Sequence, residues 1–484
     1  MSTAWSLSAF AQSTQKELIV ANGADVTNFS PLRFGGPNGA IINELYDPIV
    51  FMNNDGTPGP AAAESWEIAP DGLSITLHLR DSTFHSGKKV TADAIKYTID
   101  KYLAPDLGGN LEQLGITGVD VIDEKTAKIN YKDKLPGIFG VLSATYVLDP
   151  DRFDNVAQQD AGSGPFQMTN WQPGVAITMD RFDKHWNNAK VSLDRITVKV
   201  IADDAAAAAS LQTGAVDLIL TAGSLALQLL QNVPGIHVQW VTSAPRTHYL
   251  ALNCTHPPLD NKLVREAISW AIDRQKILQV SYSERGEVTC QPWSSTHWAH
   301  DASVEKLCGF DKEKAKQLMQ QSGQKPFTIS VNASTDAYSP GSVATAQILQ
   351  QDFKDIGITL QINTFEPAQA RKKINASDFD MVLHSYTEGG NDPQFIFPSA
   401  LLGPGGRSKF TSPELEAAVT EASNATTLDQ RKAAYKKLSE TIVDTAYIMP
   451  FVHEAKPVPM RDQISGFDVD HIGVAVLYTV VKAG

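Results

Sequence analysis

The chain has 484 residues, several times the usual domain length of ~100–150 residues, so we expect two or three compact units. Hydrophobic residues make up 42% and charged residues 20% of the chain, a composition that excludes disordered, coiled-coil and collagen-like proteins. The formal net charge is −13, so no general attraction to nucleic acid or to anionic lipid is expected.

The N-terminal residues carry a pattern typical of an export signal. Ala9-Phe10-Ala11 precedes Gln12, which is the small-x-small arrangement at which secretory signals end. We interpret residues 1–11 as the remnant of such a signal, with a frayed N-terminus as the alternative. No stretch of the chain approaches the roughly 18–20 uninterrupted apolar residues that a membrane-spanning helix needs.

Strand and helix patterns occur along the whole chain and predict a mixed α/β protein. Short β-branched or alternating runs predict strands at 17–21, 74–79, 127–131, 177–181, 195–200, 238–241 and 249–253. Apolar residues at helical spacing, often after Ser, Thr, Asp or Pro, predict helices at 91–102, 205–212, 262–280, 312–321, 342–356, 368–375, 413–424 and 428–445.

Two proline-rich places mark boundaries in this pattern. Pro257-Pro258 follows a predicted strand and precedes a long amphipathic helix, and the prolines of 453–459 (HEAKPVP) break a helical pattern. The last stretch, 474–481, has strand character. If this late strand pairs with the N-terminal half, the chain crosses twice between two lobes, and two hinge segments join the lobes over a cleft.

The three cysteines allow at most one disulfide and have no paired spacing for zinc. Cys254 lies in an apolar, strand-like run where a buried thiol is expected. Cys290 and Cys308 flank a loop rich in Trp, Pro and His, which a bridge would close. We therefore favour a bridge between Cys290 and Cys308.

Several sequence blocks follow one another in an order that points to a known family. They are Ala63-Glu64-Ser65-Trp66 through Thr91-Ala92-Asp93; Gly162 to Phe166 (GSGPF) with Trp171 and Trp186; Leu252-Asn253 through Ala271-Ile272-Asp273-Arg274; and Gly357-Ile358 with Phe379-Asp380-Met381. Together they resemble the extracellular solute-binding proteins of bacterial ABC importers, family 5, which take peptides, nickel chelates and opines.

The resemblance implies a two-lobed periplasmic binding protein fold of α/β class, type II, of the large peptide-binding kind with an extra subdomain. The first lobe would comprise residues 12–250 and 460–484, with the subdomain at about 46–170, and the second lobe residues 251–459. The implied function is to capture a small polar solute, such as a short peptide, an opine or a sugar conjugate, in the cleft between the lobes. The implied partner is a membrane ABC permease, and a monomer without cofactor in the periplasm is expected.

Catalytic motifs are absent from the sequence. It contains no G-x-S-x-G elbow, no H-E-x-x-H and no P-loop, and 403–407 (GPGGR) lacks the Lys-Ser/Thr that grips phosphate. His297 and His300 lack a third ligand for zinc, so we expect them to pack or to lie at the surface. We expect no enzyme; the alternative of another class is a hydrolase that uses Glu388 and Asp392 as an acid/base pair.

Candidate ligand-binding residues gather after the predicted strand that ends at Tyr386. The loop 387–393 (TEGGNDP) carries Glu388, Asn391 and Asp392, and loops at the ends of sheet strands are common ligand sites. In peptide-binding relatives an Asp of this loop pairs with the ligand's amino group; Asp392 before Pro393 resembles the family's Asp-Pro. The anchoring Asp of the family aligns nearer to Gly389; Glu388, one position away, is a candidate substitute, with a solvated carboxylate as the alternative.

Aromatic and arginine side chains complete the candidate ligand set. Aromatic faces grip ligands in such clefts, and the candidates are Phe34, Trp293, Trp298 and Tyr386, each with a core role as the alternative. Arg246 and Arg407 would clamp a carboxylate or phosphate of the ligand, or would form surface or interlobe ion pairs. A nickel or other metal chelate remains the alternative ligand.

Three charged residues on the predicted helix 262–280 have a structural interpretation. Arg265, Asp273 and Arg274 share this helix with an apolar face, so we expect them to tie it to its neighbours. Gly162 and Gly164 with Pro165 suit a tight turn that requires unusual φ angles. These residues are predicted to be scaffold rather than ligand contacts.

Overall fold

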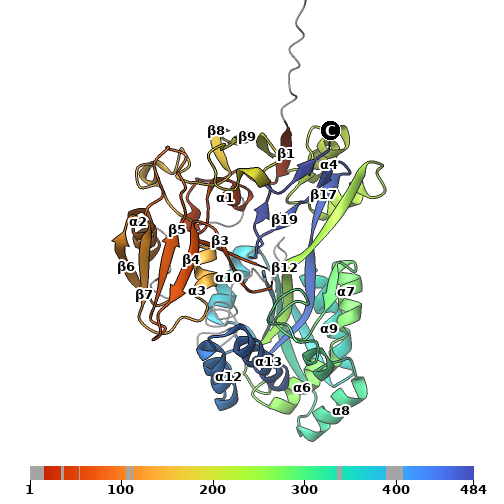
Figure 1. The fold of residues 1–484 in the computed structure, drawn as a ribbon. Helices are drawn as coiled ribbons and strands as arrows, with labels where there is room; N and C mark the ends of the chain where they lie inside the picture. The colour runs from red at the N-terminus through yellow and green to blue at the C-terminus, as the bar shows by residue number, and fades with distance from the viewer. Residues whose placement is uncertain are drawn as a thin grey trace, which may run out of the picture.

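The structure, a computed structural model, describes residues 16–33, 38–53, 55–104, 111, 114–334, 341–387, 407–471 and 473–483. Figure 1 shows two lobes, one above the other, with a small subdomain beside the upper lobe. The upper lobe holds β1, β8–β11, α1, α4, α5 and β18–β21; the subdomain holds β2–β7, α2 and α3; the lower lobe holds β13–β16 and α6–α13. Among the described residues no helix is both long and apolar enough to cross a membrane.

The strands are β1 (Glu17–Asn22), β2 (Val50–Met52), β3 (Pro58–Pro60), β4 (Ala63–Ile68), β5 (Ser74–Leu79), β6 (Ile116–Asp123), β7 (Thr126–Tyr131), β8 (Phe166–Gln172), β9 (Ala176–Arg181), β10 (Arg195–Val200), β11 (Leu218–Ile219), β12 (Ile236–Leu252), β13 (Gly286–Val288), β14 (Phe327–Ser334), β15 (Ile358–Phe365), β16 (Met381–Thr387), β17 (Ile448–Arg461), β18 (Ile464–Ser465), β19 (Asp468–Val469), β20 (Ala475–Val476) and β21 (Val481–Lys482).

The helices are α1 (Gly39–Leu45), α2 (Ala92–Leu103), α3 (Ile138–Ser143), α4 (Asp204–Thr213), α5 (Ser224–Leu230), α6 (Lys262–Ala271), α7 (Arg274–Tyr282), α8 (Lys312–Gln321), α9 (Ser342–Lys354), α10 (Pro367–Ala376), α12 (Pro413–Asn424) and α13 (Leu428–Thr445). Side-chain caps fix several of their starts. Asp311, Ser412 and Thr427 accept hydrogen bonds from the first-turn amides of α8, α12 and α13.

Two long antiparallel strands, β12 and β17, run through both lobes. Their pairing extends from Ile236 opposite Arg461 in the upper lobe to Ala251 opposite Ile448 in the lower lobe. The largest irregularity in this pairing is a bulge, at which four residues of β12, 242–245, lie opposite a single residue of β17, Ala455. The interruption contains Ala244 at a φ of 53° and a proline, Pro245, which has no N–H to donate. We therefore locate the joint between the lobes at this bulge.

The sheet continues in both directions from this strand pair. In the order β15-β14-β16-β12-β17-β11-β1-β10-β9-β8, the first strands belong to the lower lobe and the last to the upper lobe. Side chains alternate across β12, so Leu250 and Leu252 pack in the core under α6, α7 and α9, whereas Tyr249 and Ala251 pack under α12 and α13. The subdomain sheet β4-β5-β7-β6 shares one continuous core with the upper lobe.

Most predicted elements match the structure to within one or two residues, but four predictions are wrong. The helix predicted at 262–280 is two helices, because Asp273 caps a new helix, α7. Residues 453–459 lie inside β17, where a break in a helix was predicted, and the runs 238–241 and 249–253 belong to one strand, β12. The strand predicted at 474–481 is reduced to β20 and β21, which pair locally with β19 and β18; β17 makes the second crossing between the lobes.

The glycines of GSGPF are required because another part of the backbone lies very close to them, not because they adopt positive φ angles. Neither Gly162 nor Gly164 has a positive φ. A Cβ on Gly162 would lie 1.8 Å from the Leu45 carbonyl oxygen, and one on Gly164 would lie 2.5 Å from the Tyr46 amide nitrogen. The prediction of a scaffold role is thus retained, but its reason changes: these glycines let the chain pass against the end of α1.

The arginines of α6 and α7 hold the lower lobe together. Arg265 is buried and donates to the carbonyl oxygens of Leu259 and Thr445. Arg274 is buried and donates to the carbonyl oxygens of Thr289 and Pro450, so it ties its helix to β17. Both guanidinium groups thus supply hydrogen-bond donors to backbone carbonyl oxygens of the lower lobe.

Glu44 is a fully buried carboxyl group in α1. Its Oε1 accepts a hydrogen bond from the Leu477 amide at 2.7 Å, whereas Oε2 has no partner among the described residues. Burial raises the pKa of Glu44 to about 8, against the opposing effect of hydrogen bonds from the Leu477 and Tyr478 amides. The side chain is therefore protonated in the folded chain at neutral pH.

We predict that this carboxyl makes the folded chain less stable as the pH rises from about 4.5 to about 8. In this window the folded chain keeps a proton that the unfolded chain has lost, so the free energy of unfolding falls by up to ~1.4 kcal/mol per pH unit. Glu44→Gln removes this slope. Thermal unfolding at pH 5, 6, 7 and 8.5 should show a Tm difference that grows in favour of the variant, whereas exposed Glu67→Gln should give a constant difference.

Candidate ligand-binding cleft

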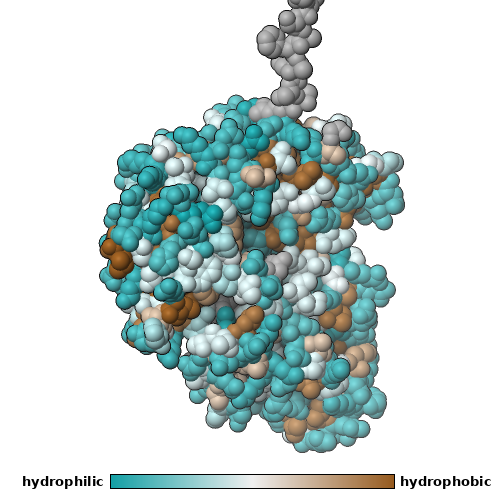
Figure 2. Space-filling view, viewed as in Figure 1, coloured by the Kyte–Doolittle hydropathy of each residue, from teal (hydrophilic) through white to brown (hydrophobic). Residues whose placement is uncertain are grey.

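A cavity of about 240 Å³ opens in the upper lobe on the side that faces the lower lobe. Figure 2 shows this face of the molecule hollowed where the subdomain, the upper lobe and the lower lobe meet. The lining combines aromatic and polar side chains from α1, β2, the turn after β9 and the β19–β20 hairpin: Asn43, Tyr46, Asp47, Pro48, Phe51, Met52, Asn53, Ser143, Pro165, His185, Trp186, Asn187, Val469, Asp470, His471, Val476 and Tyr478. Such a lining is typical of ligand sites.

Asp47 fixes one side of this cavity. Its Oδ1 accepts hydrogen bonds from His185 Nε2 and Trp186 Nε1, both at 3.1 Å, and its Oδ2 accepts one from Ser163 Oγ at 3.0 Å. Asp47 is buried, so these three donors compensate for its lost hydration. The carboxylate thereby holds the turn that carries Trp186 against α1, and the cavity wall is rigid there.

The β19–β20 hairpin forms the opposite side of the cavity. Asn43 Nδ2 donates to Asp470 Oδ2 at 2.8 Å, and the Val474 amide donates to Asp470 Oδ1 at 2.8 Å. His471 Nε2 lies 2.7 Å from the Ser143 hydroxyl oxygen. Burial lowers the pKa of His471 to about 4, so the imidazole is neutral at neutral pH.

The lower lobe faces this cavity with the loop between Cys290 and Cys308, which are joined by a disulfide. Trp293 is fully buried and packs edge-on against Tyr435 of α13. Trp298 is half-buried, also meets Tyr435 edge-on, and lies under the Arg431 guanidinium at 4.7 Å. Trp293 is thus a core residue of the lower lobe, and Trp298 is the tryptophan of this loop that stays partly exposed while packing against α13.

His297 lies between these two tryptophans and faces the upper lobe. Its Nδ1 accepts a hydrogen bond from the Ala299 amide, and its buried Nε2 has no hydrogen-bond partner among the described residues. Burial lowers the pKa of His297 to about 3, and the charge of Arg431 and the neighbouring imidazoles, including His471 of the upper lobe, act in the same direction. A neutral imidazole from each lobe therefore borders the cleft.

The β2–β3 hairpin touches the lower lobe directly. Gly56 at its tip has a φ of 84°, and a Cβ on it would lie 2.8 Å from Cγ and 3.3 Å from Cβ of Trp298. Asp55 accepts hydrogen bonds from the Thr57 amide and hydroxyl, which lower its pKa, and the charge of Lys432 on α13 adds a smaller effect. The hairpin is thus a third connection between the lobes, away from β12 and β17.

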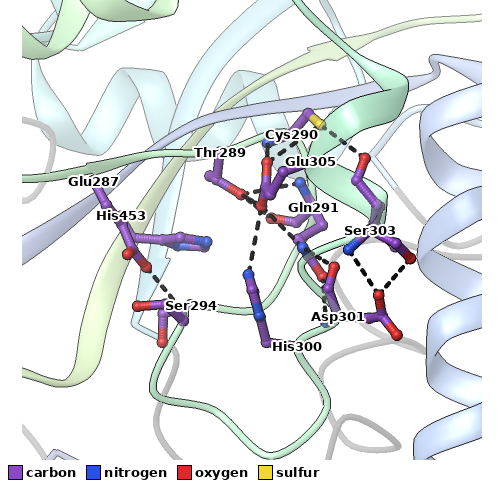
Figure 3. Close-up of polar contacts among 12 residues, drawn as sticks. Glu287, Thr289, Cys290, Gln291, Ser294, His300, Asp301, Ser303, Glu305 and His453 are labelled. Carbon is purple, nitrogen blue, oxygen red and sulfur yellow. Dashed lines mark hydrogen bonds and ion pairs between the residues drawn. The ribbon is translucent and has the colours of Figure 1, made fainter.

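The floor of the cleft is the strand pair at the bulge. Thr247 Oγ1 lies 2.8 Å from His453 Nδ1, and His248 Nε2 lies 2.9 Å from Glu454 Oε2. Arg246 stands opposite Glu454 in the ladder. Burial lowers the pKa of His453 to about 4, so this imidazole is neutral as well. Figure 3 shows the His453 side chain near Thr289 and the loop that carries His300.

The structure brings four of the predicted ligand residues to the lower-lobe side of this cleft. Besides Trp293 and Trp298, Tyr386 donates its hydroxyl to the Pro292 carbonyl at 2.6 Å, and Arg407 Nη1 donates to the Tyr249 hydroxyl. The rings of Tyr249 and Tyr386 lie 5.8 Å apart. Arg246 lies at the bulge, opposite Glu454 of β17 on one side and Thr387 of β16 on the other. Phe34, Glu388, Asn391 and Asp392 lie outside the described residues.

Sequence reasoning did not find the upper-lobe wall. Asp47, Asp470 and His471 stand in turns without a motif, and their proximity depends on pairing between residues more than 400 positions apart, as in the Asn43–Asp470 bond. One signal was present: Asp55-Gly56 between two short runs is a typical hairpin turn. It predicts the β2–β3 hairpin, although not its contact with Trp298.

Comparisons with known proteins agree with this architecture. The profile described as "Bacterial extracellular solute-binding proteins, family 5 Middle" matches residues 57–408. The chain is 25% identical to "Heme-binding protein A" of Haemophilus influenzae over 94% of this chain and 90% of that protein, and 24% identical to "Dipeptide-binding protein" of Pseudomonas aeruginosa over 96% and 95%. The solved structure of HbpA2 from Haemophilus parasuis superposes with a TM-score of 0.86 at 22% identity, over 97% of this chain and 100% of that chain.

The hairpin contact generates a prediction about the arrangement of the lobes. The Cβ positions of residues 56 and 298 are 3.3 Å apart, close to the ~3.8 Å mean of disulfides. We predict that Gly56→Cys with Trp298→Cys, in a Cys254→Ser background, forms an internal bridge on mild oxidation, which peptide mapping by mass spectrometry detects. Moving the second cysteine to Phe310, an exposed residue in the lower lobe, should give no internal bridge. Failure of the first pair to bridge would contradict the contact.

Proposed function

The chain belongs to the bacterial extracellular solute-binding proteins of family 5, and on that premise we propose that it captures a short peptide or another small polar solute, such as an opine or a sugar conjugate. The solute binds between the two lobes, outside the cytoplasm, and is passed unchanged to the membrane permease of an ABC importer. We infer that the binding unit is a monomer of two lobes joined at the bulge, at 242–245 of β12 and Ala455 of β17, several residues before the sequence-based bounds of 12–250 with 460–484 and 251–459; the extra subdomain is at about 46–170. Binding, without turnover, is the proposed activity.

The observation that carries this proposal is the cavity in the upper lobe, on the side toward the lower-lobe loop between Cys290 and Cys308. Its volume of about 240 Å³ lies just below the ~300–1,000 Å³ of sites for drug-sized ligands, which favours a small solute. Asp47 and Asn43 hold the lining of this cavity in place, and the loop that packs on α13 belongs to the lower lobe across the cleft. Groups that are already fixed lose little entropy when a ligand arrives, so this arrangement supports binding.

A metal chelate is the second candidate ligand, because the unpartnered Nε2 of His297 favours it. Neutral imidazole is the form that ligates metals, and His471 borders the same cleft from the upper lobe. Among the described residues, the cleft histidines do not form a group of three ligands close enough to hold a bare ion. A metal would therefore bind as part of a chelate; heme, which the name of one relative mentions, is an example of such a chelate.

A hydrolase that uses Glu388 and Asp392 is the alternative of another class. Incubation of the chain with a peptide library and with glycosides, followed by mass spectrometry, separates it from a binding protein. A binding protein retains one solute after gel filtration and releases it unaltered on denaturation. Accumulating product would overturn the proposed function.

For each of the two candidate ligands, different substitutions are expected to weaken binding. For a peptide whose amino group is anchored by the loop after β16, Asp392→Asn or Glu388→Gln leaves a buried cation unpaired, which costs ~3–5 kcal/mol and weakens binding roughly a hundredfold or more. The exposed Asp444→Asn serves as a matched control, and less than about a fivefold change is expected there. Calorimetric titration with the solute identified by native mass spectrometry measures these changes. If neither loop variant loses tenfold, an anionic ligand held by Arg246 or Arg407 becomes the better explanation.

For a metal chelate, His297→Ala should abolish binding that the loop variants leave intact. We predict that, if this second candidate is correct, Ni²⁺ with free L-histidine or iron protoporphyrin binds the chain and loses at least tenfold in affinity in His297→Ala. The surface variant His237→Ala, outside the cleft, should bind as the unmodified chain does. Absence of binding by both probes eliminates these chelates and leaves the peptide proposal untouched.

A further inference from the structure

The loop that forms the lower wall of the cleft is fastened at its base by a disulfide and by one carboxylate. Figure 3 shows Glu305 among Thr289, Cys290, Gln291 and His300. Glu305 Oε1 accepts from Thr289 Oγ1 at 2.8 Å and from Gln291 Nε2 at 2.9 Å, and Oε2 accepts from the Cys290 amide at 3.0 Å. A carboxylate that accepts three bonds is held in one orientation.

This carboxylate lies against both sulfurs of the disulfide. Sγ of Cys290, Sγ of Cys308 and a carboxylate oxygen of Glu305 all lie within 4.8 Å of one another. Among the described residues, this is the one group of three or more Cys, His, Asp and Glu side chains with such spacing. A third donor type, the imidazole of His300, lies beside this group: its Nε2 is 3.7 Å from Glu305 Oε1, although His300 is outside the set that shares the 4.8 Å spacing.

We propose that, when the disulfide is reduced, these side chains form a zinc site. Two thiolates, one imidazole nitrogen and one carboxylate oxygen are the donor types that tetrahedral Zn²⁺ takes in proteins. The ligands would be Cys290, Cys308 and Glu305, and His300 would move in from beside Glu305 as the fourth. The proposal does not depend on which solute the cleft binds.

The change between the two states is balanced. A dithiol reductant, of the kind that exchanges with protein disulfides, supplies two electrons and two protons; the S–S bond breaks, two S–H groups form, and the reductant becomes a disulfide. Each thiol then loses its proton as its sulfur binds Zn²⁺, so one ion replaces two protons. In the reverse exchange the oxidised reductant takes two electrons from the two thiolates and two protons from water, so the S–S bond forms again and the ion is released.

The structural consequence concerns the wall of the cleft. The disulfide spans 18 residues, and this span carries Trp293, His297 and Trp298. An ion bound by Cys290 and Cys308 closes the same loop as the bridge does. The chain would thus keep its aromatic wall in place in a reducing environment, where disulfides do not persist.

The test uses the full chain in a Cys254→Ser background, so that Cys290 and Cys308 supply all the thiols. The protein is reduced without oxygen by a phosphine, and Co²⁺ is added as a spectroscopic probe, followed by Zn²⁺. We expect one Co²⁺ per chain with the charge-transfer and d–d bands of a tetrahedral thiolate complex, and its displacement by Zn²⁺. The oxidised chain should give neither band.

Variants assign the ligands. Cys308→Ser should remove the thiolate bands, and Glu305→Gln and His300→Ala should each weaken Co²⁺ binding at least tenfold. Glu287→Gln, a carboxylate near the same loop that accepts from the Ser295 amide, is the matched control and should bind as before. Glu305→Gln also removes hydrogen bonds that hold the loop, so circular dichroism of each reduced variant is recorded. If Glu305→Gln unfolds, His300→Ala alone tests the ligand assignment.

Two results would overturn the proposal. One is a reduced chain that shows no tetrahedral cobalt bands. The other is metal binding that persists unchanged in Cys308→Ser or in both Glu305→Gln and His300→Ala, which would place the ion elsewhere on the chain.

Discussion

Continuous pairing of β12 with β17 is the constraint from which the two-lobed architecture follows. Each lobe contributes its own strands to the same sheet, so neither lobe can move without the pair. The larger of two irregularities in the pairing is where residues 242–245 face Ala455 alone and Pro245 has no N–H to donate; the smaller one lies between His248 and Tyr249. Because backbone hydrogen bonds hold the pair above and below this bulge, rotation of one lobe against the other is concentrated there.

The segments that form both walls of the cleft connect to the strand pair close to this bulge. The upper wall includes β19 and β20, which follow β17 into the upper lobe, and the lower wall begins after β13, which pairs with β17 in the lower lobe. Thr296 of the lower wall donates its hydroxyl to the Thr242 carbonyl within the bulge. A small change of backbone angles there therefore alters the distance between the walls, while the hairpin contact at Gly56 and Trp298 resists it.

Sequence reasoning succeeded where structure is determined locally and failed where it depends on distant pairing. The strands at 74–79 and 195–200 and the helices at 312–321, 413–424 and 428–445 agree with the structure because alternation, helical spacing and caps are local signals. β17 was missed because its prolines suggest a break. Pro457 and Pro459 are two apart, so both direct their missing N–H to the same side, and β11 pairs with β17 only at Met460.

The same distinction explains the candidate site. Aromatic loop residues were found from their type, but their roles depend on partners that the sequence does not reveal: Tyr386 donates to the Pro292 carbonyl, and Arg407 donates to the Tyr249 hydroxyl. These bonds position the lower wall before any solute arrives, as Asp47 and Asn43 position the upper wall. Since both walls are ordered in advance, little ordering entropy remains to be lost on binding. The free energy of bringing the walls together at the bulge then becomes the main variable that a solute must overcome.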